Sequence, residues 1–387
     1  MKVKPSTSVL LVGGSFSSLP IIKALSEYGL KLILISGDKT EPGHNFAEHS
    51  IVCDYSDVIE SLKALDSIDF DYVVPSCNDK AYKLASIVAS IRKLPGYDEL
   101  QTCELISSKL KFREFTQSND ISSPKHFNKS KIMEDPTCFP ILVKPNISFS
   151  GRGISKIFSS SEIETAEAAA CAVGLEPNFT YEEFIDGTLH SVSVFISGQT
   201  IFESFFVDEF CEAYPYQVDN SNYPSRLTIE NRVTVLKNLD KMIKKLNLVD
   251  GLLHAQFMLC DSGIKIIETM RRAPGDLYGN LIEYSSGFEY YKNYVSSFIA
   301  MDFEKIDLSN SNTRNIARYT ATNVKSTNVN SFIVRKKLIS FYPLAKCGDT
   351  VDQAPFGKSA IAFMEYNSSE ALFQDQPNFG INSISQT

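Results

Sequence analysis

A glycine-rich stretch between residues 139 and 154 constrains the fold more than any other part of the sequence. It reads Phe-Pro-Ile-Leu-Val-Lys-Pro-Asn-Ile-Ser-Phe-Ser-Gly-Arg-Gly-Ile. The apolar residues 141–143 predict a short strand, which Lys144 ends and Pro145 stops. In the loop that follows, glycine and serine let backbone N–H groups turn toward an anion, and Lys144 adds a positive charge. An apolar run at 154–158 then predicts a second strand. An ordinary hairpin with a surface lysine is the alternative interpretation.

Further motifs follow this stretch in order along the chain. Residues 180–187 read Thr-Tyr-Glu-Glu-Phe-Ile-Asp-Gly, residues 251–258 read Gly-Leu-Leu-His-Ala-Gln-Phe-Met, and residues 266–278 read Ile-Ile-Glu-Thr-Met-Arg-Arg-Ala-Pro-Gly-Asp-Leu-Tyr. A lysine before a glycine loop, an acidic pair and late metal-ligand positions on neighbouring strands resemble the ATP-grasp superfamily of carboxylate–amine ligases. Each motif is weak alone, but their order and spacing are fairly specific. The resemblance covers roughly residues 8–300.

The resemblance implies an α/β ATP-grasp fold. Its parts are an N-terminal parallel-sheet domain (1–105), a linker helix with a lid (106–190), a metal and catalytic subdomain (191–302) and a C-terminal β-rich lobe (303–387). The residue pattern agrees with the first part, because apolar runs at 8–12, 30–36 and 71–75 alternate with helical patterns at 19–30, 57–65 and 81–91. Residues 206–227 show no clear period and predict a loop-rich segment, and short strands are expected at 331–334, 337–341 and 359–364.

The resemblance also implies a nucleotide site. The expected ATP-binding residues are Lys109, Lys144, Ser150, Gly151, Arg152, Gly153, Glu182, Glu183, Phe184 and Ile185. Adenine needs a donor and an acceptor at its edge, which the strand backbone at Glu183 and Ile185 would supply, and Glu182 would accept from its amino group. Lys109 begins a predicted helix after Ser108, a suitable N-cap that stands where the family has Asp. A solvated basic helix face is the alternative for Lys109, and Leu189 leaves the ribose contact open.

The predicted metal ligands are Glu268 and Gln256. Mg²⁺, with Mn²⁺ as an alternative, takes oxygen ligands and tolerates one or two protein carboxylates beside nucleotide phosphates. Gln256 stands where the family has an acid, and Met270 stands where it has Asn. Either the metal depends more on phosphates and water, or catalysis is weakened or lost. A structural salt bridge is the alternative role for Glu268.

The expected catalytic residues are Arg272 and His254. Arg272 matches the arginine that follows the family's metal motif, and its planar fork suits a carboxylate or an acyl phosphate. Arg271 is a candidate substrate residue, although its side chain would point to the opposite strand face. His254 shares a strand face with Gln256 and is equally well explained as a core histidine. Gly14 and Ser15, at a strand end, are candidate substrate residues or simply a tight turn.

These residues predict an ATP-dependent ligase that joins a small-molecule carboxylate to an amine through an acyl phosphate, releasing ADP and phosphate. A nucleotide-binding protein of this fold without ligase activity and a phosphotransferase are the alternatives. A net charge of −8 without a long basic run argues against nucleic acid, and no apolar run is long enough for a bilayer. The eight cysteines form no Cys-x-x-Cys pair, which favours a reducing cytoplasm. The sequence leaves open whether the chain forms a homodimer.

Overall fold

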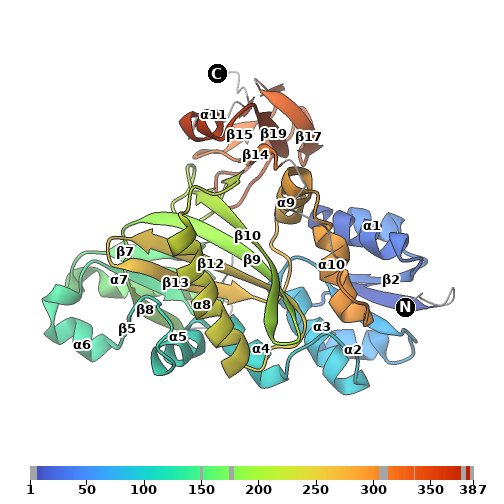
Figure 1. Cartoon of the computed structure of the whole chain (residues 1–387), viewed down its shortest axis with the longest axis horizontal. Helices are drawn as coiled ribbons and strands as arrows, with labels where there is room; N and C mark the ends of the chain where they lie inside the picture. Colours follow the sequence, from blue (N-terminus) through green and yellow to red (C-terminus); the bar gives the residue numbers. More distant parts are fainter. Residues whose placement is uncertain are drawn as a thin grey trace.

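The computed structural model describes residues 7–148, 151–173, 178–304, 313–334 and 336–375, together with the backbone of 381–383. The N-terminal domain, on the right in Figure 1, is a parallel sheet in the order β3-β2-β1-β4. Its elements are β1 (Ser8–Val12), α1 (Leu19–Glu27), β2 (Lys31–Ser36), β3 (His49–Val52), α2 (Val58–Leu65), β4 (Tyr72–Pro75), α3 (Asp79–Arg92) and α4 (Leu100–Ser107). The predicted strand–helix alternation is confirmed, and apolar clusters cover this sheet on each face.

The lid, on the left in Figure 1, contains an antiparallel sheet in the order β5-β8-β6-β7. Its elements are α5 (Lys109–Ser118), β5 (His126–Phe127), α6 (Lys129–Glu134), β6 (Ile141–Pro145), β7 (Ser155–Ile157), α7 (Ile163–Val173) and β8 (Phe179–Glu183). Helix α7 packs its Ile163, Ala166 and Ala170 onto this sheet. Gly151 and Gly153 have φ values of +66° and +75°, which accounts for glycine at these turn positions between β6 and β7.

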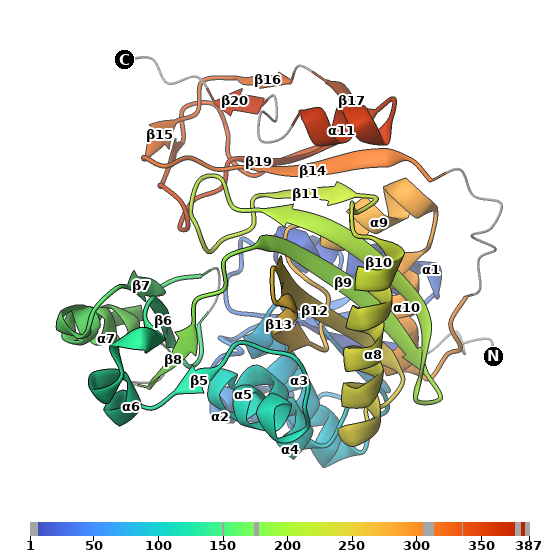
Figure 2. The same ribbon diagram turned by 60° about the vertical axis from the view of Figure 1, so that its left-hand side comes forward.

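In the described part of the chain, the large sheet has eight strands in the order β13-β12-β9-β10-β11-β14-β19-β17. The strands are β9 (Thr188–Ser197), β10 (Thr200–Phe210), β11 (Asn220–Tyr223), β12 (Gly251–Cys260), β13 (Gly263–Met270), β14 (Asn315–Ala321), β17 (Lys337–Pro343) and β19 (Ala360–Tyr366). Helix α8 (Ile229–Lys245) covers one face, and α9 (Tyr278–Ser286) and α10 (Tyr290–Ser296) pack against the other (Figure 2). The sheet runs across the boundary predicted between residues 302 and 303.

Short elements complete the C-terminal lobe and the connections. The lobe adds β15 (Thr327–Asn328), β16 (Phe332–Val334), β18 (Thr350–Val351), α11 (Ser369–Gln374) and β20 (Ile381–Ser383). The 3-10 turns are η1 (Phe16–Ser18), η2 (Pro42–Asn45), η3 (Pro136–Cys138), η4 (Ser160–Glu162) and η5 (Ser297–Ile299). Among the described residues, no helix has the length and apolar character that crossing a bilayer requires.

The prediction of a loop-rich segment at 206–227 is wrong in part. Strand β10 extends to Phe210, and β11 pairs on one side with β10 and on the other with β14. The residues of β11 read Asn-Ser-Asn-Tyr, and the first three are fully buried. Because polar residues occupy buried strand positions, the segment has no hydrophobic alternation from which a strand could be predicted.

A buried ion pair ties the N-terminal domain to the large sheet. The Nε of Arg271 lies 2.7 Å from Oδ2 of Asp98, and both side chains are almost fully buried. The guanidinium also donates to the carbonyls of Leu252 and Val249, at 2.7 and 2.6 Å, and Asp98 accepts the backbone N–H of Val249 at 2.8 Å. The side-chain polar groups of the pair therefore all have partners, either each other or the backbone at Val249 and Leu252, at the start of β12.

We expect Asp98→Ala to destabilise the protein by about 3–5 kcal/mol, because it leaves a buried guanidinium without its carboxylate. Urea unfolding measures the change. Lys244→Ala is the matched control, since Lys244 pairs with Asp240 on the surface of α8 and its loss should cost at most about 1 kcal/mol. Equal effects of the two substitutions would contradict a structural role for the Arg271–Asp98 pair.

Candidate active site

Charged side chains from three parts of the fold converge where the lid meets the large sheet. Lys109 begins α5, Lys144 lies near the end of β6, Glu182 lies on β8 and Glu268 lies on β13. Burial lowers the pKa of Lys109, and its nearby charges are Glu268, Lys144, Glu182 and Asp79. We call Lys109, Lys144, Glu182, Glu268 and Asp79 the charged cluster. Ser108 caps α5 by accepting from the N–H of Lys111, as predicted, and this fixes where Lys109 emerges.

Glu182 is the most buried member of the charged cluster. Its Oε2 lies 2.8 Å from Nζ of Lys144 and 3.1 Å from Nη2 of Arg113. Burial alone would raise the pKa of Glu182, but the two cations outweigh it and hold the pKa at about 2. Its Oε1 is buried and has no hydrogen-bond partner among the described residues. Glu182 is thus ionised, and its Oε1 can still accept a hydrogen bond.

Arg113 is a site residue that the sequence analysis missed. Its side chain is 1% exposed, and it donates to the carbonyls of Ile266 and Ile267 as well as to Glu182. It belongs to a stretch that reads Lys-Leu-Lys-Phe-Arg, which is typical of a solvated basic helix face. The available signal was the spacing, because Arg113 lies four residues after Lys109 and therefore on the same side of α5.

The predicted adenine hinge is partly engaged within the protein. The backbone N–H of Glu183 donates to the carbonyl of Lys125 at 2.9 Å, and its carboxylate accepts the N–H of Lys125 at 3.1 Å. The ammonium of Lys156 lies 3.4 Å from the centre of the Phe184 ring. Ile185 follows directly after the last residues of β8 and is half-buried. The hinge thus presents an aromatic and an aliphatic side chain beside a strand end.

The two predicted metal ligands face each other across neighbouring strands. Gln256 on β12 pairs in register with Glu268 on β13, so their side chains lie on the same sheet face. The Nε2 of Gln256 donates to Oε2 of Glu209 at 2.6 Å. Burial raises the pKa of Glu209, which lies on β10. Glu209 was not predicted as a site residue, because it falls in the stretch interpreted as a loop.

Arg272 joins the end of β13 to the N-terminal domain. Its Nε and Nη2 lie 2.6 and 2.9 Å from the two carboxylate oxygens of Asp79, the first residue of α3. Burial alone would lower the pKa of Arg272, but Asp79 raises it above its usual range. Arg271 points the other way, toward Asp98, as expected for adjacent strand residues.

His254 is a buried, neutral histidine. Its Nδ1 lies 3.0 Å from the hydroxyl of Ser193, and its ring packs edge-on against Tyr278 at 4.9 Å. Burial, with the nearby charge of Arg272, lowers the pKa of His254 to about 3. These contacts match the core-histidine alternative, and a catalytic role for His254 stays a prediction.

The remaining predicted residues lie at the edges of the site. The N–H of Gly14 donates to Oε2 of Glu41 at 3.1 Å, and Ser15, which is partly exposed, occupies the N-cap position of the turn η1 without a side-chain capping hydrogen bond. The carbonyl of Gly151 accepts from the hydroxyl of Tyr214, and the guanidinium of Arg152 lies 4.6 Å from the centre of the Phe356 ring. Ser150 lies outside the described residues.

Comparison with known proteins supports the fold. No family model matches the chain. The formate-dependent phosphoribosylglycinamide formyltransferase of Janthinobacterium sp. (strain Marseille) is 27% identical over 180 residues, which are 44% of this chain and 43% of that protein. The match therefore spans somewhat less than half the length of that relative.

Solved structures match along almost the whole chain. The L-amino acid ligase of Bacillus licheniformis superposes with a TM-score of 0.80 at 17% identity, covering 100% of both chains. The biotin carboxylase domain of Hydrogenobacter thermophilus 2-oxoglutarate carboxylase, solved as a dimer with MgADP and bicarbonate, superposes with a TM-score of 0.76 at 13% identity, covering 98% of this chain and 92% of that one. The chain has the ATP-grasp fold, and the resemblance seen in its motifs is confirmed.

The charge of Glu182 has a testable effect on stability. The folded-state pKa of about 2 lies below the ordinary value of 4.5. The carboxylate therefore stabilises the fold above the unfolded-state pKa, and this stabilisation is lost as the pH falls through the folded-state pKa. We expect the free-energy difference of unfolding between wild type and Glu182→Gln to be largest at neutral pH and to shrink below about pH 5.

Urea unfolding at several pH values measures this difference. Glu114→Gln, which changes an exposed glutamate of the same helix as Arg113, is the control and should show no such trend. A deficit of Glu182→Gln that does not vary with pH would mean that the carboxylate charge is not what stabilises the fold.

Proposed function

We propose that the protein is an ATP-dependent ligase that joins a small-molecule carboxylate to an amine through an acyl phosphate, releasing ADP and phosphate. The observation that carries the proposal is the charged cluster, in which Lys109 and Lys144 lie beside Glu182 and Glu268 on facing elements of the lid and the large sheet. Phosphoryl transfer needs cations for the phosphates and a carboxylate for the metal, and this cluster contains both.

ATP is proposed to lie between the lid strands β6 and β8 and the sheet strands β12 and β13. Lys144 and Lys109 would neutralise phosphate charge, and the glycine turn at 151–153 would bring backbone N–H groups toward it. The spare Oε1 of Glu182 is an acceptor suited to an N–H group, in agreement with the predicted contact to the adenine amino group. Phe184 and Ile185 would provide apolar walls.

The residues at the strand pair β12–β13 fit a magnesium ion. Glu268 supplies a carboxylate, and the amide nitrogen of Gln256 is occupied by Glu209, which leaves the amide oxygen of Gln256 as an acceptor. Glu209 adds a second carboxylate beside Gln256, the position at which the family has an acid. An oxygen donor set of this kind suits Mg²⁺ or Mn²⁺, whose bound form would neutralise phosphate charge.

The acceptor substrates are proposed to meet the phosphates near Arg272. Its guanidinium is held by Asp79 and is 12% exposed, so it is preorganised beside the strand ends of the N-terminal domain. The positive charge fixed at this position would attract a carboxylate or the acyl phosphate. The names of the relatives support carboxylate activation in general, since one uses formate and another joins L-amino acids.

The direct test is ADP release from MgATP with a panel of small carboxylates, each with and without amines. We expect ADP only with a matched acid and amine, together with an amide product identified by mass spectrometry. ADP without an amide product would favour a phosphotransferase. Nucleotide binding without ADP under any pairing would favour a protein that kept the fold and lost ligation.

We expect Glu268→Gln to lower turnover about 10²–10³-fold while nucleotide affinity changes little, because charge stabilisation at the phosphates is lost and the adenine contacts remain. Steady-state rates across an Mg²⁺ titration measure the effect. Gln256→Glu, which places a carboxylate next to Glu209, should strengthen Mg²⁺ binding and so lower the Mg²⁺ concentration that gives the half-maximal rate. Glu164→Gln, an exposed position on the lid helix α7, is the control. Full activity of Glu268→Gln at ordinary Mg²⁺ would falsify this placement of the site.

A further inference from the structure

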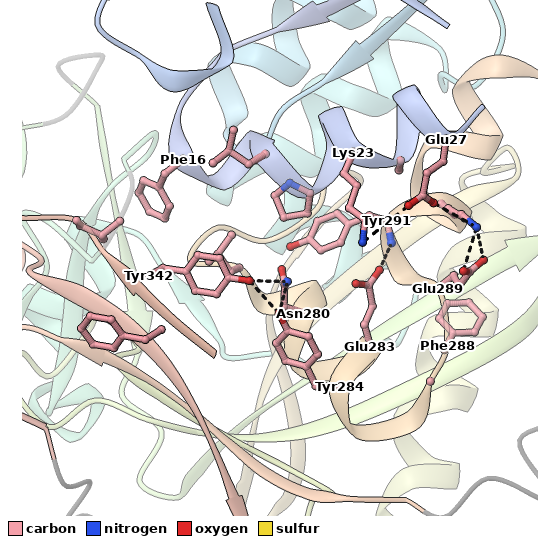
Figure 3. A pocket seen from close by; sticks show the side chains of 18 of the residues that line it. Phe16, Lys23, Glu27, Asn280, Glu283, Tyr284, Phe288, Glu289, Tyr291 and Tyr342 are labelled. Carbon is pink, nitrogen blue, oxygen red and sulfur yellow. Dashed lines mark hydrogen bonds and ion pairs between the residues drawn. The ribbon is translucent and has the colours of Figure 1, made fainter. Parts of the chain in front are cut away.

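A cavity of about 560 Å³ opens between helix α1, helices α9 and α10 and strand β17 (Figure 3). Its volume falls in the range of small-molecule sites. Its lining residues include no member of the charged cluster, and neither Gln256, Glu209 nor Arg272. The cavity is therefore separate from the proposed nucleotide and metal site, and the proposed function makes no use of it.

The wall of the cavity is largely apolar and aromatic. Lining residues of this kind are Phe16, Leu19, Leu277, Phe288, Phe341 and Leu344. On one side the hydroxyls of Tyr284 and Tyr342 lie 2.9 Å apart, and the amide nitrogen of Asn280 lies 3.4 and 3.5 Å from them. Asn280 is 6% exposed, and its Oδ1 has no hydrogen-bond partner among the described residues. The Oδ1 of Asn280 is thus a buried hydrogen-bond acceptor at the cavity wall that no described residue satisfies.

Most of the charged groups around the cavity neutralise one another. Lys292 lies 2.9 Å from Glu289 and 3.3 Å from Glu27, and Lys23 lies 3.8 Å from Glu27. Figure 3 shows this network on one side and the paired tyrosine hydroxyls on the other, with Glu283 between them. Glu283 has no cation within ion-pair distance among the described residues; its Oε1 accepts the backbone N–H of Tyr291 at 3.1 Å.

The environment of Glu283 disfavours its charge in the empty cavity. Burial, with smaller contributions from the acids Glu289 and Glu27, raises the pKa of Glu283 to about 7 even though the N–H of Tyr291 and Lys23 act to lower it. A partly buried carboxylate without a counter-ion within ion-pair distance among the described residues, in a cavity with an unpaired amide oxygen and aromatic rings, is complementary to an ammonium group with an apolar body.

We propose that this cavity binds a small organic cation, an ammonium group carried on an apolar or aromatic body. The ammonium would lie against Glu283, and the body would pack on the aromatic wall. Because the lining comes from the N-terminal domain, from α9–α10 and from β17, a bound ligand contacts three parts of the fold at once. The site therefore suits an effector rather than a reacting substrate.

The test compares amines with neutral molecules of the same shape on the purified full chain without nucleotide. The probes are phenethylamine against phenethyl alcohol and butylamine against butanol, with dissociation constants measured by ligand-observed NMR titration. We expect at least one amine to bind at least about tenfold more tightly than its alcohol, the margin of one charge-assisted hydrogen bond. Equal affinity within both pairs, or no binding of either amine, would overturn the proposal.

Two substitutions separate the role of Glu283 from general effects. Glu283→Gln should abolish the preference for the amine, whereas Glu289→Gln, which removes an acid already paired with Lys292, should retain it. Circular dichroism and ADP release establish that each variant is folded. An unchanged preference in Glu283→Gln would overturn the assignment. Sedimentation velocity provides a further check, because a dimer that covers the cavity and excludes both amines would also overturn it.

The pH dependence gives an independent readout. The charged groups that face Glu283 are Lys23 and Glu27 from α1 and Glu289 and Lys292 from α10; Tyr342 faces it from β17, and the pKa of that phenol is raised to about 12. Since the ionised carboxylate binds the cation, wild-type affinity for the amine should increase from about pH 6 to about pH 8. This increase should be absent in Glu283→Gln.

Discussion

The contact of Glu182 with Lys144 and Arg113 is the interaction on which the site depends. Three buried charges from β8, β6 and α5 meet there, and each would be costly without the others. Through Arg113 the same group reaches the backbone of β13 at Ile266 and Ile267, which directly precede Glu268. The lid and strand β13 are therefore held in one geometry by a single carboxylate.

A second ion pair positions the acceptor side of the site. Arg272 follows β13, and Asp79 begins α3, so the pair joins the large sheet to the strand ends of the N-terminal domain. Arg271, the residue before it, is fixed to Asp98 on the opposite side. Adjacent arginines thus serve different neighbours because consecutive strand residues point in opposite directions. The sequence alone could establish this divergence but not which partner each arginine would find.

The parts of the fold that could be predicted are those with a local signal. The alternating apolar runs of the N-terminal domain, the cap at Ser108 and the hairpin from Gln256 to Glu268 all have short-range patterns, and the structure contains them. Strand β11 could not be predicted because its buried residues are polar. Arg113 and Glu209 were missed as site residues because their partners lie 69 and 47 residues away, and for Arg113 the only local signal was its spacing from Lys109.

The large sheet contains strands from both sides of residue 302, and this limits where the chain can be divided. Strand β14, beyond residue 302, hydrogen-bonds to β11 along residues 220–223, and β19 and β17 extend the sheet further. A shortened chain ending near residue 302 would leave the backbone groups of β11 unpaired along a new sheet edge. Such an edge is a template for pairing with other chains. The C-terminal lobe therefore covers this edge of the large sheet, and shortened chains that omit it would be prone to aggregate.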